Sequence, residues 1–433
     1  MVLLDRSKDI FEEASTLMPR GVNTAPRFFK PHPIYSQRAK GAHIWDVDGN
    51  DYIDHHLGHS AVILGHQFPK VIDAINRALE VGLSTGVESR LPLDLAKKMH
   101  QIIPCAENVS LATSGTEAVT LALHVSRACS KKKKIIKMEG HFHGRHDDML
   151  VSCFAAGGSA TKPIPHVDSA GVVAEERRRN VLVVPFNDTE ALEKVVKAHK
   201  KEVAALIMEP VAFNNGCVLP KEGYLASVRE ITEDNDVILI FDEIISGFRV
   251  RPGGMGEYYN VKPDLATFGK PMANGYSISA LVGRKDLFQV LAPGGSAYFG
   301  GTFNANQVSV AAAIACLDEL SSGTVQEHLS KLTRRLVDGF SRIASKLHIR
   351  MTLPALGGQF AFYFTDREVT NFREAKRAGG GEDFFRLQHN LLERGFYFHR
   401  SPTYHNGISF SHTEEDIDHL LQALESSLKE TMR

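Results

Sequence analysis

The sequence predicts an α/β fold, with a mainly parallel β-sheet in a large domain and a smaller α+β domain beside it. Short apolar runs of four or five residues alternate with longer stretches in which apolar residues recur at the period of a helix. Such runs are typical of strands buried on both faces, and their alternation with helices is typical of βαβ units. The runs lie at residues 135–138, 181–184, 204–208, 237–241 and 278–282, and the helical stretches between them include 189–200 and 223–234.

Charge and composition exclude several classes of protein. Lysine and arginine total 50 against 51 aspartates and glutamates, so no overall positive charge would attract nucleic acid or an anionic membrane. Hydrophobic residues make up 43% of the chain and charged residues 23%, which is the composition of a globular protein and not of a disordered one. No run of about eighteen apolar residues is present, and charge follows directly after Leu4, so we expect neither a membrane span nor a signal peptide.

The five cysteines indicate a reducing compartment. They are odd in number, form no C-x-x-C motif and are too few for a disulfide framework. We therefore expect reduced thiols in a cytoplasmic protein that has neither nucleic acid nor a membrane as a partner.

Both chain ends are expected to build the smaller domain. Residues 44–53 form a hairpin pattern that turns at Asp48-Gly49-Asn50. Two long helical patterns, at 308–320 and 325–347, are followed by short strands near 360–363 and 407–410. The predicted parts are an N-terminal segment at 1–55 that contributes to the small domain, a large domain at 56–310, and a C-terminal small α+β domain at 311–433.

Small polar residues at a predicted helix start suggest a phosphate site. Residues 109–111 (Val-Ser-Leu) form a short, mostly apolar run, and Ser114, Gly115 and Thr116 then occupy the first turn of a helix. Unpaired amides and the positive end of the helix dipole meet there, and glycine allows a close approach, so a phosphate group fits this turn. With Glu117 the same residues also form the pattern of an ordinary capping box, which leaves a structural interpretation open.

A carboxylate and an amine each follow a buried strand. Asp242 follows the apolar run 237–241, and Lys270 ends the run that begins at residue 265. An unpaired charge at such a place is costly, and a desolvated lysine can act as a nucleophile toward carbonyl groups. The alternative is a simple ion pair between Asp242 and Lys270 across neighbouring strand ends.

Together with an aromatic ring, these groups match one kind of cofactor. Phe142 follows the predicted strand at 135–138 and offers a flat apolar face. Phosphate loop, carboxylate, amine and aromatic ring are the four contacts that a phosphorylated pyridine aldehyde needs. The sequence therefore predicts pyridoxal 5'-phosphate, with Lys270 as its Schiff-base lysine and Asp242 at its ring nitrogen.

Two other patterns have less specific interpretations. His141, His143 and His146 have the H-x-H-x-x-H spacing of a metallohydrolase site, but Arg145 stands where such a site would favour an acid, so no metal is expected. The basic runs at 131–134 and 177–179 are interpreted as solvated surfaces.

A series of motifs connects the chain to a known family. In chain order they are GVNTAPR at 21–27, WDVDG at 45–49, LGH at 64–66, SGTEA at 114–118, GHFHG at 140–144, PFND at 185–188, EPVA at 209–212, DEIISGFR at 242–249, PDLATFGK at 263–270, GTF at 301–303 and SHTEEDID at 411–418. In these motifs the sequence resembles the class III aminotransferases, and among them the glutamate-1-semialdehyde 2,1-aminomutase branch. The resemblance implies the type I fold of pyridoxal-phosphate-dependent transferases, with a seven-stranded, mainly parallel sheet.

The resemblance also implies roles for single residues. Lys270 and Asp242 match the family's cofactor lysine and ring-nitrogen partner, and Thr302 matches a threonine that reaches the phosphate of the neighbouring subunit, which implies a homodimer with shared active sites. The other positions that match cofactor contacts are Ser114, Gly115, Thr116, Phe142, His143 and Asn214. At Phe142 the family usually has tyrosine.

Two arginines are the candidates for substrate binding. Arg27 matches the arginine that binds the substrate carboxylate, a role that suits its forked guanidinium. Arg400 is a candidate for a second contact, with a solvated loop arginine as the alternative.

The predicted function is transfer of an amino group between an amino acid, or a related amine that bears a carboxylate, and a keto or aldehyde acceptor. Residues 54–60, 271–274 and 301–307 depart from the aminomutase pattern, so the intramolecular shift of a glutamate-1-semialdehyde 2,1-aminomutase is the alternative. A metallohydrolase and a scaffold without catalysis are the remaining, less favoured hypotheses.

Overall fold

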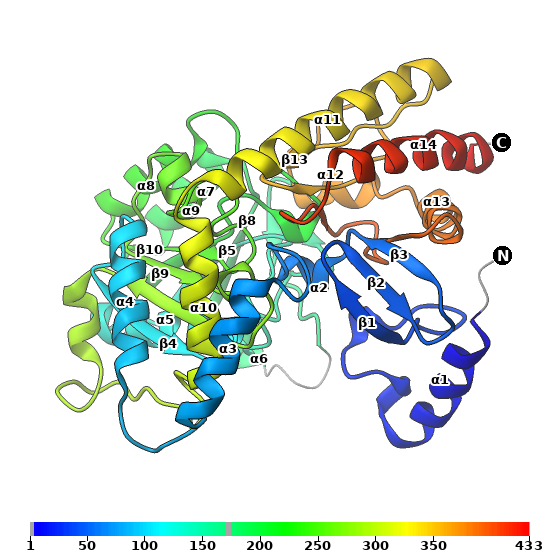
Figure 1. Ribbon diagram of the computed structural model, residues 1–433. Coiled ribbons are helices and arrows are strands. Elements are labelled where there is room, and N and C mark those ends of the chain that lie inside the picture. Colours follow the sequence, from blue (N-terminus) through cyan, green and yellow to red (C-terminus); the bar gives the residue numbers. More distant parts are fainter. Residues whose placement is uncertain (1–3, 170–174, 433) are drawn as a thin grey trace.

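A seven-stranded sheet forms the centre of the larger part of the protein (Figure 1). The computed structural model describes residues 4–169 and 175–432. The strand order is β4, β12, β11, β10, β9, β5 and β8, which in that order span Asn108–Ala112, Ser279–Gly283, Leu265–Phe268, Ile238–Glu243, Val203–Met208, Lys134–Met138 and Val181–Val184. The predicted α/β fold with a mainly parallel sheet is confirmed.

One strand of this sheet runs opposite to the prediction. β12 pairs antiparallel with both β11 and β4, whereas β10, β9, β5, β8 and β11 pair in parallel. Only residues 269–278 separate β11 from β12, and a parallel return needs a crossover of about a dozen or more residues. The parallel strand predicted at 278–282 therefore exists, but its predicted direction was wrong.

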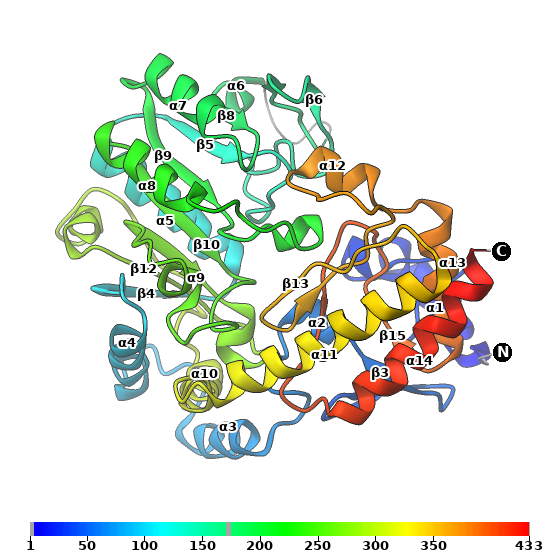
Figure 2. The ribbon, with the colours of Figure 1, turned by 90° about the horizontal axis from the view of Figure 1, so that it is seen from above.

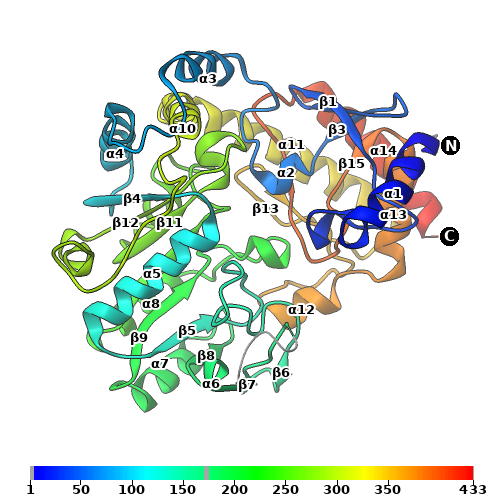
Figure 3. The ribbon, with the colours of Figure 1, turned by 90° about the horizontal axis from the view of Figure 1, so that it is seen from below.

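Helices cover both faces of the sheet. Helix α5 (Gly115–Ser130) packs on one face, where its apolar residues share a core cluster with Ile207 and Ile240. Helices α7 (Thr189–Ala198) and α8 (Tyr224–Asp234) belong to the cluster on the other face, with Leu206 and Leu239. Alternate residues of β9 and β10 thus face opposite helices, as the pleat of a strand requires. Figure 2 shows the molecule from above, with α8 in front, and Figure 3 shows it from below, with α5 in front.

The two ends of the chain meet in a small four-stranded sheet. β1 (Ser36–Lys40), β2 (His43–Asp46) and β3 (Asp51–Asp54) form an antiparallel meander, which confirms the predicted hairpin. β15 (Phe396–Tyr397) then pairs parallel with β3. The predicted domain boundaries stay predictions, and the one at residue 310 falls inside α10 (Gln307–Leu320). Residues 1–3 of the predicted N-terminal segment lie outside the described residues.

Helices dominate the C-terminal part. α10 and α11 (Thr324–Leu347) confirm the two predicted helical patterns, and the strands near 360 and 407 are two residues long each. Other elements are α1 (Asp5–Leu17), α2 (Leu57–Ser60), α3 (Pro69–Val81), α4 (Arg90–Ile102), α6 (Glu175–Arg178), α9 (Gly254–Tyr258), α12 (Phe372–Arg377), α13 (Glu382–Glu393), α14 (Glu414–Thr431), β6 (Gly157–Gly158), β7 (Pro163–Ile164), β13 (Ala355–Leu356), β14 (Gln359–Phe360) and β16 (Asn406–Gly407). In the described part of the chain no single helix is long and apolar enough to cross a membrane, and α10 with α11 reaches that length and composition only as a pair bent by 68°.

Asp264, which precedes β11, ties neighbouring elements together. Its carboxylate accepts hydrogen bonds from Arg229 at 2.9 Å, from Arg284 at 3.0 Å and from the Leu239 amide at 2.9 Å. We predict that Asp264→Ala lowers the free energy of unfolding by about 3 kcal/mol, because it leaves the buried Leu239 amide without its acceptor and removes the buried carboxylate that Arg229 and Arg284 share. Urea unfolding measures this change.

The matched control is Asp286→Ala, which removes an exposed partner of the same Arg284. Because exposed ion pairs contribute little, this variant should unfold at nearly the urea concentration of the parent protein. Equal losses in the two variants would contradict the role assigned to Asp264.

Candidate active site

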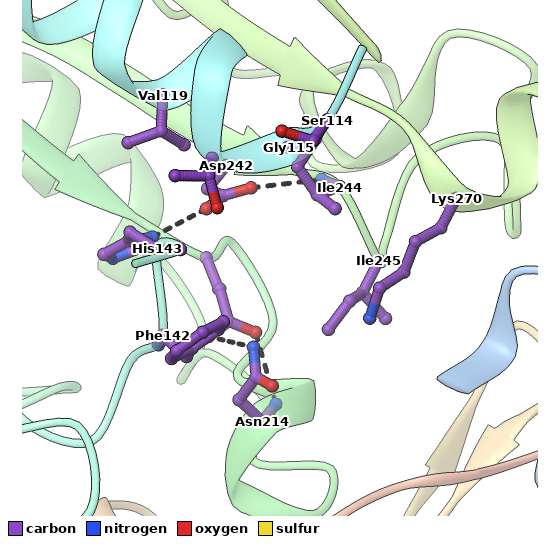
Figure 4. Close-up of a pocket in the computed structure, with 13 residues that line it drawn as sticks. Ser114, Gly115, Val119, Phe142, His143, Asn214, Asp242, Ile244, Ile245 and Lys270 are labelled. Carbon is purple, nitrogen blue, oxygen red and sulfur yellow. Dashed lines mark hydrogen bonds and ion pairs between the residues drawn. The ribbon is translucent and has the colours of Figure 1, made fainter. Parts of the chain in front are cut away.

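A cavity of about 220 Å³ lies at the edge of the sheet where β9, β10 and β11 end (Figure 4). The residues that line it come from the start of α5, the loop after β5, the end of β10, and the segments that follow β9, β10 and β11. The predicted site residues among them are Ser114, Gly115, Thr116, Phe142, His143, Asn214, Asp242 and Lys270. The structure thus brings the predicted phosphate loop, aromatic ring, carboxylate and amine to one cavity.

The start of α5 serves two purposes that the sequence left as alternatives. Ser114 is the N-cap residue, and the Glu117 carboxylate accepts hydrogen bonds from the amides of Thr113 at 2.7 Å and Ser114 at 3.3 Å, so the capping box is present. The following amides of a helix have no acceptor within the helix, and Gly115 and Thr116 line the cavity. The capping box and an anion at the first turn are therefore compatible.

Asp242 is held by three donors at the end of β10. Nδ1 of His143 lies 2.7 Å from one carboxylate oxygen, and the Thr267 hydroxyl and the Ile244 amide donate to the other, both at 3.1 Å. Burial lowers the pKa of His143, and Asp242 opposes this shift. These contacts fix the direction of a buried carboxylate that lines the cavity.

Lys270 lies across the cavity from Asp242 and His143 (Figure 4). It follows β11 through Gly269 and has a φ of +34°, which is strained for a residue with a side chain and is typical of functional sites. Within residues 4–169 and 175–432 its amine has no carboxylate within 4.0 Å, so the simple ion pair with Asp242 is not formed. Burial lowers the pKa of this amine to about 8, and the positive charge of Arg249 acts in the same direction.

Glu209 is a cavity residue that the sequence analysis missed. It follows β9, and its carboxylate accepts hydrogen bonds from the Asn214 side chain at 3.0 Å, the Asn214 amide at 3.2 Å and the Phe142 amide at 3.3 Å. Burial raises the pKa of Glu209 to about 7. Glu209 thereby fixes two predicted cofactor contacts, and the strand-end argument that pointed to Asp242 applies equally to it.

Three predicted site residues do not line this cavity. Thr302 and Arg27 are exposed, and the guanidinium of Arg400 lies over the ring of Phe29 at 4.1 Å. Burial lowers the pKa of His59 to about 4, and the positive charges of Lys270 and Arg27 act in the same direction. The roles of Thr302, Arg27 and Arg400 stay predictions.

The histidines of the H-x-H-x-x-H pattern have separate partners. Nδ1 of His141 accepts a hydrogen bond from the Glu209 amide at 3.0 Å, His143 contacts Asp242, and Nδ1 of His146 accepts from the Asp148 amide at 3.2 Å. His143 therefore orients the Asp242 carboxylate and His141 holds the backbone of Glu209, roles that spacing alone does not reveal.

Comparisons with known proteins agree with this geometry. The family model described as aminotransferase class-III matches residues 25–428. A glutamate-1-semialdehyde 2,1-aminomutase from Methanocaldococcus jannaschii is 40% identical over 422 residues, which cover 98% of this chain and 97% of that protein. An omega-transaminase structure from Sphaerobacter thermophilus is 27% identical, with a TM-score of 0.93 over 99% of this chain and 98% of that chain. A variant of a glutamate-1-semialdehyde-aminomutase from Pseudomonas aeruginosa PAO1, in complex with PMP, is 26% identical, with a TM-score of 0.88 over 98% of this chain and 94% of that chain.

The fold and the cavity define an enzyme of the pyridoxal-phosphate-dependent type I fold. Within that class, the chain belongs to the class III aminotransferase family, which confirms the resemblance found in the sequence. The enzyme acts on small molecules, and its cofactor is pyridoxal 5'-phosphate. The donor set fits this cofactor, because the cavity offers a helix start, a rigidly held carboxylate, the Phe142 ring and an amine without a carboxylate partner among the described residues.

The lowered pKa of Lys270 leads to a testable pH dependence. Only the neutral amine can attack an aldehyde, so the rate of covalent attachment of pyridoxal phosphate to the cofactor-free protein should rise with pH and level off above about 8. Stopped-flow absorbance between pH 6 and 11 measures this rate. A midpoint near 10.4, the ordinary value for lysine, would contradict the desolvation of this amine.

Proposed function

We propose that the enzyme moves an amino group between neighbouring carbons of one small carboxylate-bearing substrate, as the name glutamate-1-semialdehyde 2,1-aminomutase describes. The observation that carries this proposal is the 40% identity, along 98% of the chain, to an enzyme of that name. The sequence analysis preferred transfer between two substrates and kept the intramolecular shift as its alternative. The relatives favour that alternative.

The residues around the cavity are assigned complementary tasks. Bound pyridoxal phosphate supplies a ring that delocalises negative charge from the substrate carbon that carries the amine. Asp242, held by His143 and Thr267, keeps the proton on the ring nitrogen. Lys270 is the attachment point and, once released, the general base that removes a proton from one substrate carbon and returns it at another.

The remaining predicted residues bind and orient. Ser114, Gly115 and Thr116 hold the phosphate, and Phe142 stacks on the ring. We assign the substrate carboxylate to Arg27 and a second polar contact to Arg400, because guanidinium groups bind carboxylates through two parallel hydrogen bonds.

Transfer between two substrates is the second candidate function. It is favoured by the departures from the aminomutase pattern at residues 54–60, 271–274 and 301–307. It is also favoured by the omega-transaminase structure, whose TM-score of 0.93 exceeds the 0.88 of the aminomutase variant.

A single-substrate reaction separates the two candidates. We predict that the holoenzyme, given glutamate 1-semialdehyde alone, forms the isomer with the amine on the neighbouring carbon, without added amine or keto acid. Mass spectrometry and chromatography detect the product. Lys270→Ala should lower the rate by roughly a thousandfold or more, because both proton transfers lose their base.

Product that forms only after a keto acid is added would overturn the intramolecular shift and establish transfer between substrates. Turnover of Lys270→Ala at the rate of the parent enzyme would overturn the role of Lys270 in either reaction.

We also propose a homodimer with shared active sites. The loop around Thr302 exposes aromatic rings, with Tyr298 79% and Phe303 64% accessible, and exposed apolar patches are typical of protein interfaces. A second copy that covers this loop would bury the rings and would allow Thr302 to reach the partner's phosphate loop, as the resemblance implies. The cytoplasm remains the proposed location, and its support is that the five cysteines are free.

Light scattering tests the proposed dimer. We predict that Phe303→Asp shifts the molar mass from that of two chains toward that of one, because a buried aspartate without a partner is costly. Phe385→Asp, which makes the same change at an exposed ring of α13, is the control and should leave the mass unchanged. A parent protein of one chain's mass would contradict the proposal.

A further inference from the structure

Three histidines form a cluster near Lys270 that the family resemblance does not explain. We call His56, His59 and His399 the histidine cluster, because one ring nitrogen of each lies within 4.8 Å of one ring nitrogen of each of the others. The rings of His56 and His399 are nearly parallel, with centroids 5.1 Å apart and an angle of 9°. Tyr404 stacks on His399 at 4.2 Å and 10°. The stack restrains the orientation of both imidazole rings.

Strand register brings these histidines together. β15 pairs parallel with β3, with Tyr397 opposite Asp54, and His399 and His56 each follow two residues later. The two rings therefore emerge side by side at the carboxyl ends of a parallel pair. Helix α2, which begins directly after His56, lies between the large sheet and the small sheet (Figures 1 and 3).

The backbone after His56 is strained in a way that positions His59. Residues Leu57 to Ser60 have φ values of +49°, +59°, +59° and +61°, so α2 is a single left-handed turn. Left-handed turns cost roughly 1–2 kcal/mol per residue with a side chain. The turn is held by the buried Arg249, which donates to the Ser60 carbonyl, and by the Ser60 hydroxyl, which donates to Gln359 at 2.6 Å.

The hydrogen bonds of the cluster fix where its protons are. The His59 amide donates to Nδ1 of His56 at 3.3 Å, and the Ser401 amide donates to Nδ1 of His399 at 3.1 Å. A nitrogen that accepts from an amide cannot carry a proton, so the neutral rings of His56 and His399 carry theirs on Nε2. Among residues 4–169 and 175–432, Nε2 of His399 has no hydrogen-bond partner, and His399 is only 3% exposed. A buried donor without an acceptor is costly, which points to a ligand that supplies one.

The same hydrogen bonds argue against a metal ion. A metal takes the lone pair of an imidazole, and its histidine ligands usually donate their other ring N–H to a carbonyl or carboxylate. In His56 and His399 the lone pair is already used by an amide, so the free nitrogens are donors and not ligands. Burial lowers the pKa of all three histidines, that of His59 to about 4, and the charge of Lys270 contributes to each shift, so the rings are neutral near pH 7.

We propose that the histidine cluster shares the substrate carboxylate with Arg27, with Nε2 of His56 and of His399 as the donors. Neutral N–H donors favour an oxygen that carries negative charge. Ring nitrogens of the cluster lie within 4.8 Å of one another, so donors on two of its rings can share the two oxygens of one carboxylate. The proposal rests on the proposed amino-group chemistry at Lys270 and holds for the intramolecular shift and for transfer alike.

The test compares amines that do and do not carry a carboxylate. The half-reaction of the holoenzyme with 4-aminobutyrate and with butylamine is followed by the absorbance of the cofactor. His399→Phe keeps the stacked ring and removes the donor, so it should lower kcat/KM for 4-aminobutyrate roughly ten- to hundredfold, mainly through KM, and leave butylamine unchanged. His399→Gln, which retains an N–H donor, should recover part of the loss, and the exposed His389→Phe should match the parent enzyme.

Binding of glutarate, measured by calorimetry, tests the same site without any reaction. Its affinity should fall in His399→Phe and in a second variant, His56→Phe, which also covers the case that the first variant does not fold. An equal loss for 4-aminobutyrate and butylamine, or unchanged glutarate binding in a folded variant, would overturn the proposal. Stoichiometric binding of Ni²⁺ by the parent enzyme that is lost in His399→Phe would overturn it in favour of a metal site. A holoenzyme that binds glutarate through His399 but converts neither amine and does not isomerise glutamate 1-semialdehyde would instead refute only the proposed function.

Discussion

The parallel pairing of β10 with β11 is the constraint on which the active site depends. In this register Asp242 lies beside Thr267, so the Thr267 hydroxyl reaches the carboxylate, and the next strand continues through Gly269 to Lys270. Because the carboxyl ends of parallel strands share one edge, β9 adds Glu209 at the same place. A shift of one residue in this register would turn Asp242 to the opposite face of the sheet. The Asp242 carboxylate would then no longer line the cavity.

The sequence predicted those parts of the site that depend on where a strand or a helix ends. Asp242 and Lys270 follow apolar runs, and Ser114 to Thr116 open a helix, so their convergence follows from general rules of α/β sheets. The same rule would have indicated Glu209, and the short connection at 269–278 would have indicated the reversed β12. The partner of Asp242 could not be inferred, because nothing in the pattern around His143 distinguishes an orienting imidazole from a metal ligand.

The histidine cluster was beyond prediction for a different reason. His56 and His399 are distant in the chain, and β15, the strand that brings them together, has only two residues, too few to show a period. The left-handed turn at Leu57 to Ser60 includes only one glycine, so the sequence carries no strong signal for it either. The positions of these rings depend on tertiary contacts such as that from Arg249 to Ser60.

Arg249, Lys270 and the histidine cluster influence one another through their charges. Arg249 is fully buried and donates to the carbonyls of Ile245 and Ser60, and its charge contributes to the lowered pKa of Lys270. Lys270 in turn contributes to the lowered pKa of the three clustered histidines. Neutral rings donate hydrogen bonds to a carboxylate without adding a cation. The lowered pKa of Lys270 therefore depends on burial and on Arg249, and not on charged imidazoles.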